Sequence, residues 1–200
     1  MVASCANRVG RTIWPALGRS RGRSCRCTHN TGIGGYFTRV ARMNDLAAQV
    51  LQTLIAKGLT VTTVESCTGG MVAAALTDIP GSSAAVDRGY VTYSNQAKAD
   101  MVGVPMVLIE SHGAVSPEVA LAMANGALAQ CAADIAIAIT GIAGPGGSDY
   151  KPEGLVCFCA ASRIGPPISV VKEFGPLGRS NVRAESVKQA LSMVLELSRR

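Results

Sequence analysis

The residues best suited to chemistry lie in one short turn, Ser66–Gly70, which holds two hydroxyls, one thiol and two glycines. A run of β-branched residues over 60–64 precedes the turn and predicts a buried strand. Good helix formers follow over 71–76, so the turn joins a strand to a helix. Open α/β sheets bind their ligands at such turns, beyond the carboxyl ends of the strands.

Two interpretations of this turn are open on local pattern alone. In the first, Ser66 or Cys67 is a nucleophile, and the N–H groups of the turn stabilise an oxyanion at the start of the helix. In the second, the turn is only structural: Ser66 caps the helix and the glycines allow close packing. The choice depends on which groups the rest of the chain brings beside the turn.

The composition favours a single α/β domain. The chain has 200 residues, of which 48% are apolar but only 4% aromatic, so its core must be built from Ala, Val, Ile and Leu. No apolar run approaches the roughly 20 residues that a membrane-spanning helix needs. The sequence therefore predicts no membrane partner.

The net charge of +6 comes from one end of the chain. Residues 1–42 contain eight Arg and no Asp, Glu or Lys, whereas residues 43–200 contain eleven Lys and Arg against thirteen Asp and Glu. The domain itself is slightly acidic, so its charge gives no reason to expect a nucleic-acid partner.

Residues 1–42 also differ in composition, because they are rich in Arg and Ser and show no hydrophobic period. This composition is typical of an organelle transit peptide; the alternative is an upstream extension, with Met43 as the functional start. A secretory signal is not expected, since the segment lacks an apolar central region. In either case we predict a disordered extension over 1–42 and a folded domain over 43–200.

Cysteine and histidine usage argues against disulfides and metal. The seven Cys are an odd number, and they form no pair of C-x-x-C motifs. The two His, His29 and His112, are too few for a histidine-ligated metal centre. We therefore predict a reducing, cytoplasmic location and neither metal nor cofactor.

The remaining pattern predicts a three-layer α/β/α domain with a mixed, mostly parallel five-stranded sheet. The first three strands alternate with helices and should be parallel. The last two strands flank only Gly165–Pro167, so they form a hairpin and make one strand antiparallel. We expect strands at 60–64, 84–94, 134–140, 155–162 and 168–174, longer helices at 44–58, 71–76, 95–103, 117–130 and 179–197, and a short helix at 106–111.

Two glycine-rich loops that each follow a strand, with Tyr93 and Lys98 between them, form one constellation. Residues 44–198 resemble the C-terminal domain of the competence/damage-inducible protein CinA, a family that includes bacterial nicotinamide-nucleotide amidohydrolases. The larger N-terminal domain of full-length CinA proteins lies outside the resemblance, and its activity is not inferred. Five ordered runs carry the resemblance: Glu65–Gly70, Pro80–Ser83, Val91–Lys98, His112–Ser116 and Thr140–Gly147.

The resemblance implies hydrolysis of nicotinamide mononucleotide to nicotinate mononucleotide and ammonia without a metal. In the family's Ser/Lys dyad, Ser66 would be the nucleophile and Lys98 its base. A Lys side chain works as a base only if burial or a cationic neighbour lowers its pKa from about 10.4 toward neutral. Asp100 would oppose this if its carboxylate faced inward. Ser83 and Tyr93 match active-site positions of the family and would relay protons or orient Lys98.

The implied substrate also needs an oxyanion site and a phosphate site. A phosphate suits the N–H groups of the second glycine-rich loop, and an anion would explain two Arg at the start of the last helix, where the dipole disfavours cations. The alternative for these Arg is a solvated surface position. The expected oxyanion and substrate-binding residues are Cys67, Thr68, Gly69, Gly70, Thr140 and Gly141. The expected phosphate-binding residues are Gly144, Gly146, Gly147, Arg179 and Arg183.

A competing function class is a binding module, in which the same loops hold a nucleotide phosphate without chemistry or the domain contacts another protein. Ser66 and Lys98 favour the enzyme, because a phosphate site requires neither residue. Cys67 is then interpreted as a small packed residue, and His112 as a structural one. The expected partner is a small nucleotide substrate, and a homo-oligomer is compatible with the sequence.

Overall fold

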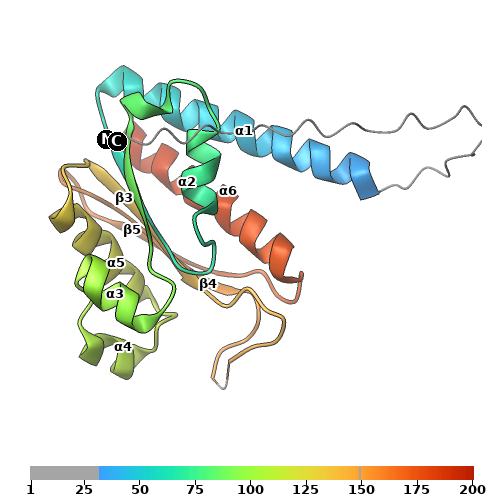
Figure 1. The fold of residues 1–200 in the computed structure, drawn as a ribbon, viewed down its shortest axis with the longest axis vertical. Coiled ribbons are helices and arrows are strands. Elements are labelled where there is room, and N and C mark those ends of the chain that lie inside the picture. The colour runs from blue at the N-terminus through green and yellow to red at the C-terminus, as the bar shows by residue number, and fades with distance from the viewer. Residues whose placement is uncertain (1–31, 149) are drawn as a thin grey trace, which may run out of the picture.

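The computed structural model describes residues 32–148 and 150–200, with side chains from residue 44 onward (Figure 1). Helices and strands alternate over the first half, and a hairpin and a long helix close the chain. The elements in order are α1 (Gly32–Lys57), β1 (Val61–Glu65), α2 (Met71–Thr77), the 3-10 turn η1 (Ser82–Ala84), β2 (Val86–Val91), α3 (Asn95–Val102), α4 (Met106–His112), α5 (Pro117–Gln130), β3 (Ile135–Gly141), β4 (Leu155–Ser162), β5 (Ile168–Glu173) and α6 (Arg179–Arg199).

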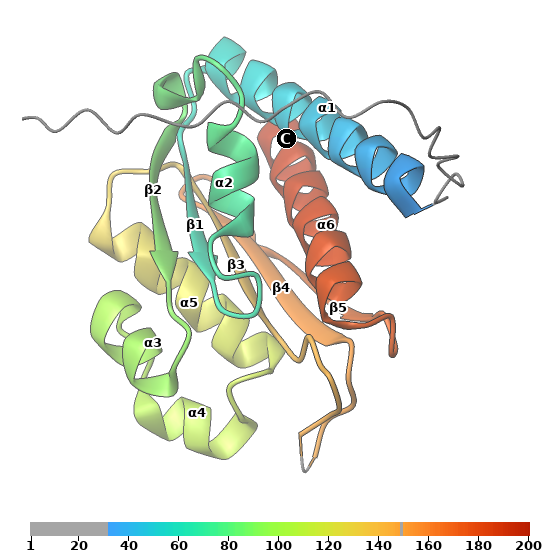
Figure 2. The ribbon, with the colours of Figure 1, turned by 45° about the vertical axis from the view of Figure 1, so that its right-hand side comes forward.

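The five strands form one mixed sheet in the order β2-β1-β3-β4-β5. β1 is parallel to both β2 and β3, because helices cross between these strands. β4 is antiparallel to both β3 and β5. The short connection between β4 and β5 makes these two strands a hairpin. The predicted mixed and mostly parallel sheet, with helices on both faces, is therefore confirmed (Figure 2).

Alternating side chains on β3 give the sheet two different faces. Ile135, Ile137 and Ile139 belong to the core beneath α1, α2 and α6. Ala136 and Ala138 belong to the core beneath α5. Because alanine is small, α5 can lie close to the sheet on that side and bring α3, which packs on α5, toward the end of β1.

The helix that carries Lys98 has well-defined ends. The Ser94 hydroxyl accepts a hydrogen bond from the Ala97 N–H at 3.0 Å and caps α3. Gly103 ends the helix with φ +67°, a conformation that glycine adopts without strain. On the facing helix, Gly126 has no room for a side chain, because a Cβ there would overlap the carbonyl oxygen of Val102. These contacts fix α3 against α5.

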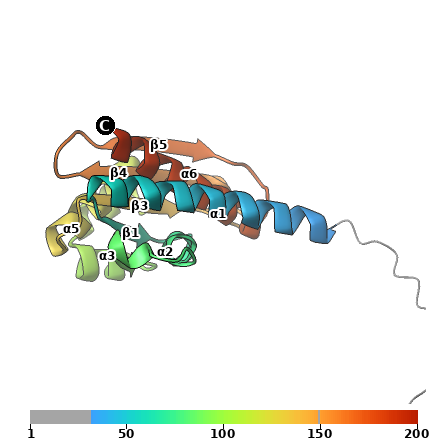
Figure 3. The same cartoon turned by 90° about the horizontal axis from the view of Figure 1, so that it is seen from above.

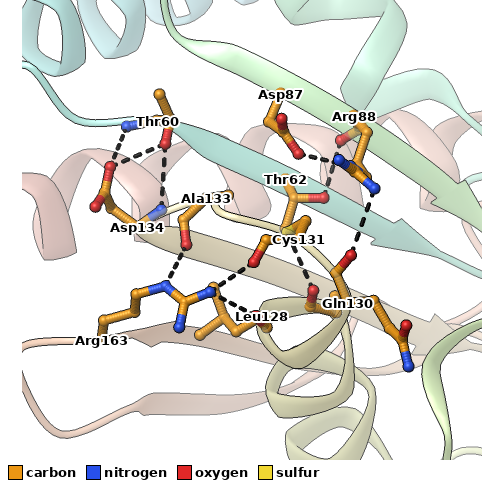
Figure 4. Close-up of polar contacts among 11 residues, drawn as sticks. Thr60, Thr62, Asp87, Arg88, Leu128, Gln130, Cys131, Ala133, Asp134 and Arg163 are labelled. Atoms are coloured by element: carbon orange, nitrogen blue, oxygen red, sulfur yellow. Dashed lines mark hydrogen bonds and ion pairs between the residues drawn. The ribbon is translucent and has the colours of Figure 1, made fainter.

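Polar contacts connect the segments at the end of the sheet where β1 and β3 begin (Figure 4). The Asp134 carboxylate accepts hydrogen bonds from the Thr60 N–H at 2.8 Å and the Thr60 hydroxyl at 2.9 Å. The Arg163 guanidinium donates to the carbonyl oxygens of Leu128, Cys131 and Ala133, which lie at and beyond the end of α5. These contacts fix the starts of β1 and β3 against the end of α5.

The structure differs from the sequence prediction at the start of α1. The helix begins at Gly32 rather than at Asn44, so residues 32–42 are helical where disorder was expected. Residues 37–46 contain neither Gly nor Pro, so a helix anchored further on can extend through them. Its N-terminal turns project beyond the sheet (Figure 3). The rest of the predicted disordered extension, residues 1–31, lies outside the described residues. Across the described ranges, no helix is long and apolar enough to cross a membrane.

We predict that Gly126→Ala destabilises the fold, because the added methyl group must push the end of α3 away from α5. Overpacking of this kind costs about 1–3 kcal/mol, which thermal and urea unfolding will measure. The matched control is Gly165→Ala, where a Cβ would meet only ordinary contact with the Ser162 hydroxyl. Equal stability of the two variants would show that the α3–α5 packing is not constrained at this point.

Candidate active site

A pocket of about 230 Å³ opens at the carboxyl ends of β1 and β3, where the sequence placed the site. It combines the turn after β1, the segment after β2, the loop before α5, the end of β3 and the start of α6. Its lining residues are Ser66, Cys67, Tyr93, Asn95, Lys98, Ala114, Val115, Thr140, Gly141, Ala143 and Arg179.

Ser66 does not cap α2, so the N-cap role expected for it in the structural interpretation is wrong. The N-cap position is Gly70, which has φ +94° and no side-chain cap. The helix end is instead satisfied by the carboxylate of Glu65, which accepts from the N–H groups of Gly70, Val72 and Ala73 at 2.9, 3.1 and 2.9 Å. The Ser66 N–H donates to the Ile139 carbonyl at 2.9 Å, and its hydroxyl lines the pocket.

Lys98 lies beside this hydroxyl. Its Nζ is 3.2 Å from Ser66 Oγ and 2.9 Å from the Thr92 carbonyl oxygen, and the residue is 1% exposed. Burial lowers the pKa of Lys98 from its ordinary value, because it disfavours the charged amine. Asp100 does not oppose this, since its exposed carboxylate accepts from Gln96 Nε2 at 2.7 Å.

This arrangement can activate the serine. A neutral lysine amine can donate one N–H to the Thr92 carbonyl and still present its lone pair to the Ser66 hydroxyl. The neighbouring thiol is less suited, because burial raises the pKa of Cys67 to about 12 and the Glu65 carboxylate adds to the rise. The thiol therefore stays protonated, and the thiolate is the reactive form of cysteine.

The expected oxyanion donors are only partly available. The Gly69 N–H donates to the Ser66 carbonyl at 3.1 Å and the Gly70 N–H to Glu65 at 2.9 Å, so both groups already have acceptors within the protein. Within the described part of the chain, the N–H groups of Cys67 and Thr68 donate to no backbone carbonyl of another residue. Cys67 lines the pocket, whereas Thr68 is completely buried and is not part of the lining.

Thr140 and Gly141 lie at the end of β3 and line the pocket, as expected. The Thr140 hydroxyl donates to the Ala114 carbonyl at 2.7 Å, which holds the loop before α5 against the end of the sheet. Gly141 has no room for a side chain, because a Cβ would press on Val156.

Tyr93 lies at the pocket, but it does not orient Lys98. Its hydroxyl accepts a hydrogen bond from Arg179 at 3.0 Å, and Arg179 also donates to the Gly144 carbonyl at 3.0 Å. Tyr93 is 59% exposed, so these two residues form part of the pocket rim. The carbonyl of Thr92, a backbone group that side-chain motifs do not indicate, holds Lys98 instead.

Ser83 does not belong to this pocket. It lies in η1, which precedes β2. Two residues further on, the Ala85 carbonyl accepts from the Val61 N–H at the start of β1. The five residues of β1 separate it from Ser66. The sequence run that contains Ser83 and the run that contains Lys98 therefore flank β2 at opposite ends of the sheet.

The second glycine-rich loop already holds an anion. The Gly146 N–H donates to the Glu153 carboxylate at 2.7 Å, and a Cβ at Gly144 would overlap that carboxylate. Gly147 packs against the backbone of 151–153. None of these three glycines lines the pocket, so the structure does not bring the expected phosphate-binding loop to it.

Arg183 also has another partner. Its guanidinium donates to the carbonyl oxygens of Cys67 at 3.1 Å and Thr68 at 2.9 Å, behind the turn that carries Ser66. Arg183 therefore stabilises the turn from outside the pocket, whereas Arg179 lines the pocket. In the described residues, no group of three or more His, Cys, Asp or Glu could hold a metal.

The comparisons with known proteins agree with the fold and with the ordered sequence runs. The family model of the CinA C-terminal domain matches residues 43–198. The chain belongs to the CinA C-terminal domain family. The match begins within α1 and includes every described strand, and residues 1–42 lie outside it.

Among relatives in this family, the nicotinamide-nucleotide amidohydrolase PncC of Escherichia coli is 50% identical over 152 residues, which cover 76% of this chain and 92% of PncC. A CinA-like protein of Mycolicibacterium paratuberculosis is 47% identical, but the match spans only 36% of that longer protein. The crystal structure of the competence/damage-inducible protein CihA of Agrobacterium tumefaciens has a TM-score of 0.76 at 47% identity and covers 78% of this chain and 94% of its own.

We predict that a small fluorophosphonate, which esterifies activated serine hydroxyls, labels Ser66. The labelling rate should rise with pH as Lys98 loses its proton, and the midpoint should lie below the titration of exposed lysines because burial lowers this pKa. Lys98→Arg should slow labelling at least about 100-fold, since a guanidinium stays protonated. Peptide mapping by mass spectrometry locates the label.

The matched control for this experiment is Asp100→Asn, which alters an exposed carboxylate on the same helix. It should label at the rate of the unaltered protein. A label on Cys67, or a Lys98→Arg variant that labels as fast as the unaltered protein, would contradict the assignment of nucleophile and base.

Proposed function

We propose that this domain hydrolyses the carboxamide of nicotinamide mononucleotide to nicotinate mononucleotide and ammonia by a Ser/Lys mechanism. The observation that carries the proposal is the buried Lys98 amine, 3.2 Å from Ser66 Oγ at the pocket wall. The substrate is suggested by the E. coli relative, whose printed name is nicotinamide-nucleotide amidohydrolase and which this chain matches over 92% of its length.

In the first half of the proposed reaction, Lys98 accepts the proton of the Ser66 hydroxyl while Oγ attacks the carboxamide carbon. The N–H group of Cys67, which lines the pocket, donates to the oxyanion that forms. The tetrahedral intermediate then collapses, and Lys98 returns the proton to the departing nitrogen. Ammonia leaves, and the nicotinoyl group stays on Ser66 as an ester.

The second half repeats these steps with water. Lys98 takes a proton from a water molecule, and the hydroxide attacks the ester carbon at the same oxyanion site. Collapse breaks the bond to Ser66 Oγ, which recovers its proton from Lys98. The product carboxylate then leaves. Both halves of the reaction use Lys98 as the base, and neither needs a metal.

Arg179 is the proposed partner of the substrate phosphate. Among the described residues it is the arginine that lines the pocket, and it lies in the first turn of α6, where a cation is disfavoured by the helix dipole. A phosphate would offset that cost.

A domain that only bound a phosphate would have no need of a buried amine beside a serine, which favours the enzyme over the binding module.

The proposal is tested by incubating the protein with nicotinamide mononucleotide and measuring both ammonia and nicotinate mononucleotide. Ser66→Ala should lower kcat by about 10³-fold or more, because only binding and oxyanion contacts remain. Asp100→Asn should keep the full rate, and dialysis against EDTA should change nothing. No ammonia from the unaltered protein, or full activity in Ser66→Ala, would overturn the proposal.

We also predict that Arg179→Ala raises KM for the mononucleotide about tenfold or more with a smaller effect on kcat, since a charge-assisted hydrogen bond contributes about 1.5–3 kcal/mol. Nicotinamide riboside, which lacks the phosphate, should be insensitive to the change. The control is Arg200→Ala, which alters an exposed arginine paired with Glu196. An equal rise in KM for the nucleotide and the riboside would show that Arg179 does not bind the phosphate.

A further inference from the structure

Glu65, the last residue of β1, is completely buried. Carboxylates are rarely buried in this way unless they are paired. Yet no cation forms an ion pair with Glu65 among the residues that the structure describes. Its charge is met instead by three backbone N–H groups, at 2.9, 3.1 and 2.9 Å.

Those N–H groups belong to Gly70, Val72 and Ala73, five to eight residues further along the chain. To reach them, the turn from Ser66 must fold back over the end of its own strand, and positive φ values at Gly69 (+59°) and Gly70 (+94°) allow this reversal. The Glu65 side chain therefore sets the shape of the turn that carries the proposed nucleophile.

The backbone of Glu65 reaches the base as well. Its carbonyl accepts from the Thr92 N–H at 2.8 Å, and the Thr92 carbonyl in turn accepts from Lys98 Nζ at 2.9 Å. The next residue, Ser66, is tied to β3 through its own N–H. One buried residue thus connects the nucleophile turn to the backbone group that holds the lysine.

We infer that Glu65 is a positioning residue for the reaction. Its carboxylate accepts from the N–H groups at the start of α2, which keeps the Ser66 hydroxyl beside Lys98 and Cys67 at the pocket wall. This role rests on the proposed function, because it is defined by the reaction that the turn carries out.

The charge of Glu65 has two further effects on the same turn. It adds to the rise in the pKa of the Cys67 thiol, so it favours the serine over its neighbour as nucleophile. It also fills the start of α2 with a negative charge, which repels a substrate phosphate from that end. The phosphate is then directed to the side of the pocket where Arg179 lies, and the carboxamide to Ser66.

The test is the isosteric variant Glu65→Gln, with Asp100→Asn as the matched change from carboxylate to amide on the surface. An amide offers one acceptor oxygen where Glu65 offers two, so the turn loses contacts. We expect kcat per folded molecule to fall about 100-fold or more while KM stays within about twofold, because positioning acts on the transition state. The pH midpoint of kcat should not move, since Glu65 neither tunes nor replaces Lys98.

A kcat within about threefold of the unaltered protein overturns the inference, and so does a rise in KM that accounts for the whole loss. A shifted pH midpoint would make Glu65 a titrating partner of Lys98 and also overturn it. If Glu65→Gln fails to fold, Glu65→Asp keeps the charge on a shorter side chain and should show the same fall in kcat, at least about tenfold, with KM unchanged.

A measurement without substrate separates this inference from the proposed function. Amide hydrogen exchange at Gly70, Val72 and Ala73 should quicken in Glu65→Gln (or Glu65→Asp), and not in Asp100→Asn. If the unaltered protein releases no ammonia, the proposed function fails alone, and exchange then decides whether Glu65 holds the turn. Unchanged exchange at all three amides overturns the role of Glu65 whatever the activity.

Discussion

The site depends on keeping one lysine side chain out of water. Lys98 is 1% exposed, and its amine contacts a carbonyl and a hydroxyl rather than a carboxylate. An unpaired buried ammonium costs several kcal/mol, whereas a neutral amine avoids most of that cost. The fold therefore stabilises the basic form of the side chain. Ser66 Oγ lies 3.2 Å from that amine, and in the proposed reaction its hydroxyl gives its proton to Lys98.

The surrounding elements hold the two groups from both sides. Ser94 caps α3, and the close contact at Gly126 fixes that helix against α5, so the lysine cannot swing toward solvent without moving a helix. On the serine side, Glu65 accepts from the N–H groups of α2 while Arg183 donates to the carbonyls of the turn. The turn is thus held by an anion at one surface and a cation at the other.

Much of this could be predicted from sequence, and the failures have physical causes. Period and turn chemistry gave the five strands and their directions, but the start of α1 was missed because helix extension needs no apolar face. Ser66 and Lys98 were paired correctly in space, although their proposed mechanism stays a prediction. Ser83 was misplaced because a motif does not show at which end of a strand it falls. The sequence did not show that Glu153, a residue beyond the glycine-rich motif, accepts from the Gly146 N–H expected to bind phosphate. Glu65 was overlooked because its role depends on a turn that folds back.

The proposed reaction depends on a lowered pKa of Lys98, and direct titration tests it. With ¹³C-labelled lysine, the Cε resonance of Lys98, assigned by its absence in Lys98→Arg, can be followed by NMR across the pH range without substrate. The account predicts that this resonance titrates below those of the exposed lysines, because burial lowers the pKa of Lys98. Titration together with the exposed lysines, or above them, would contradict the account.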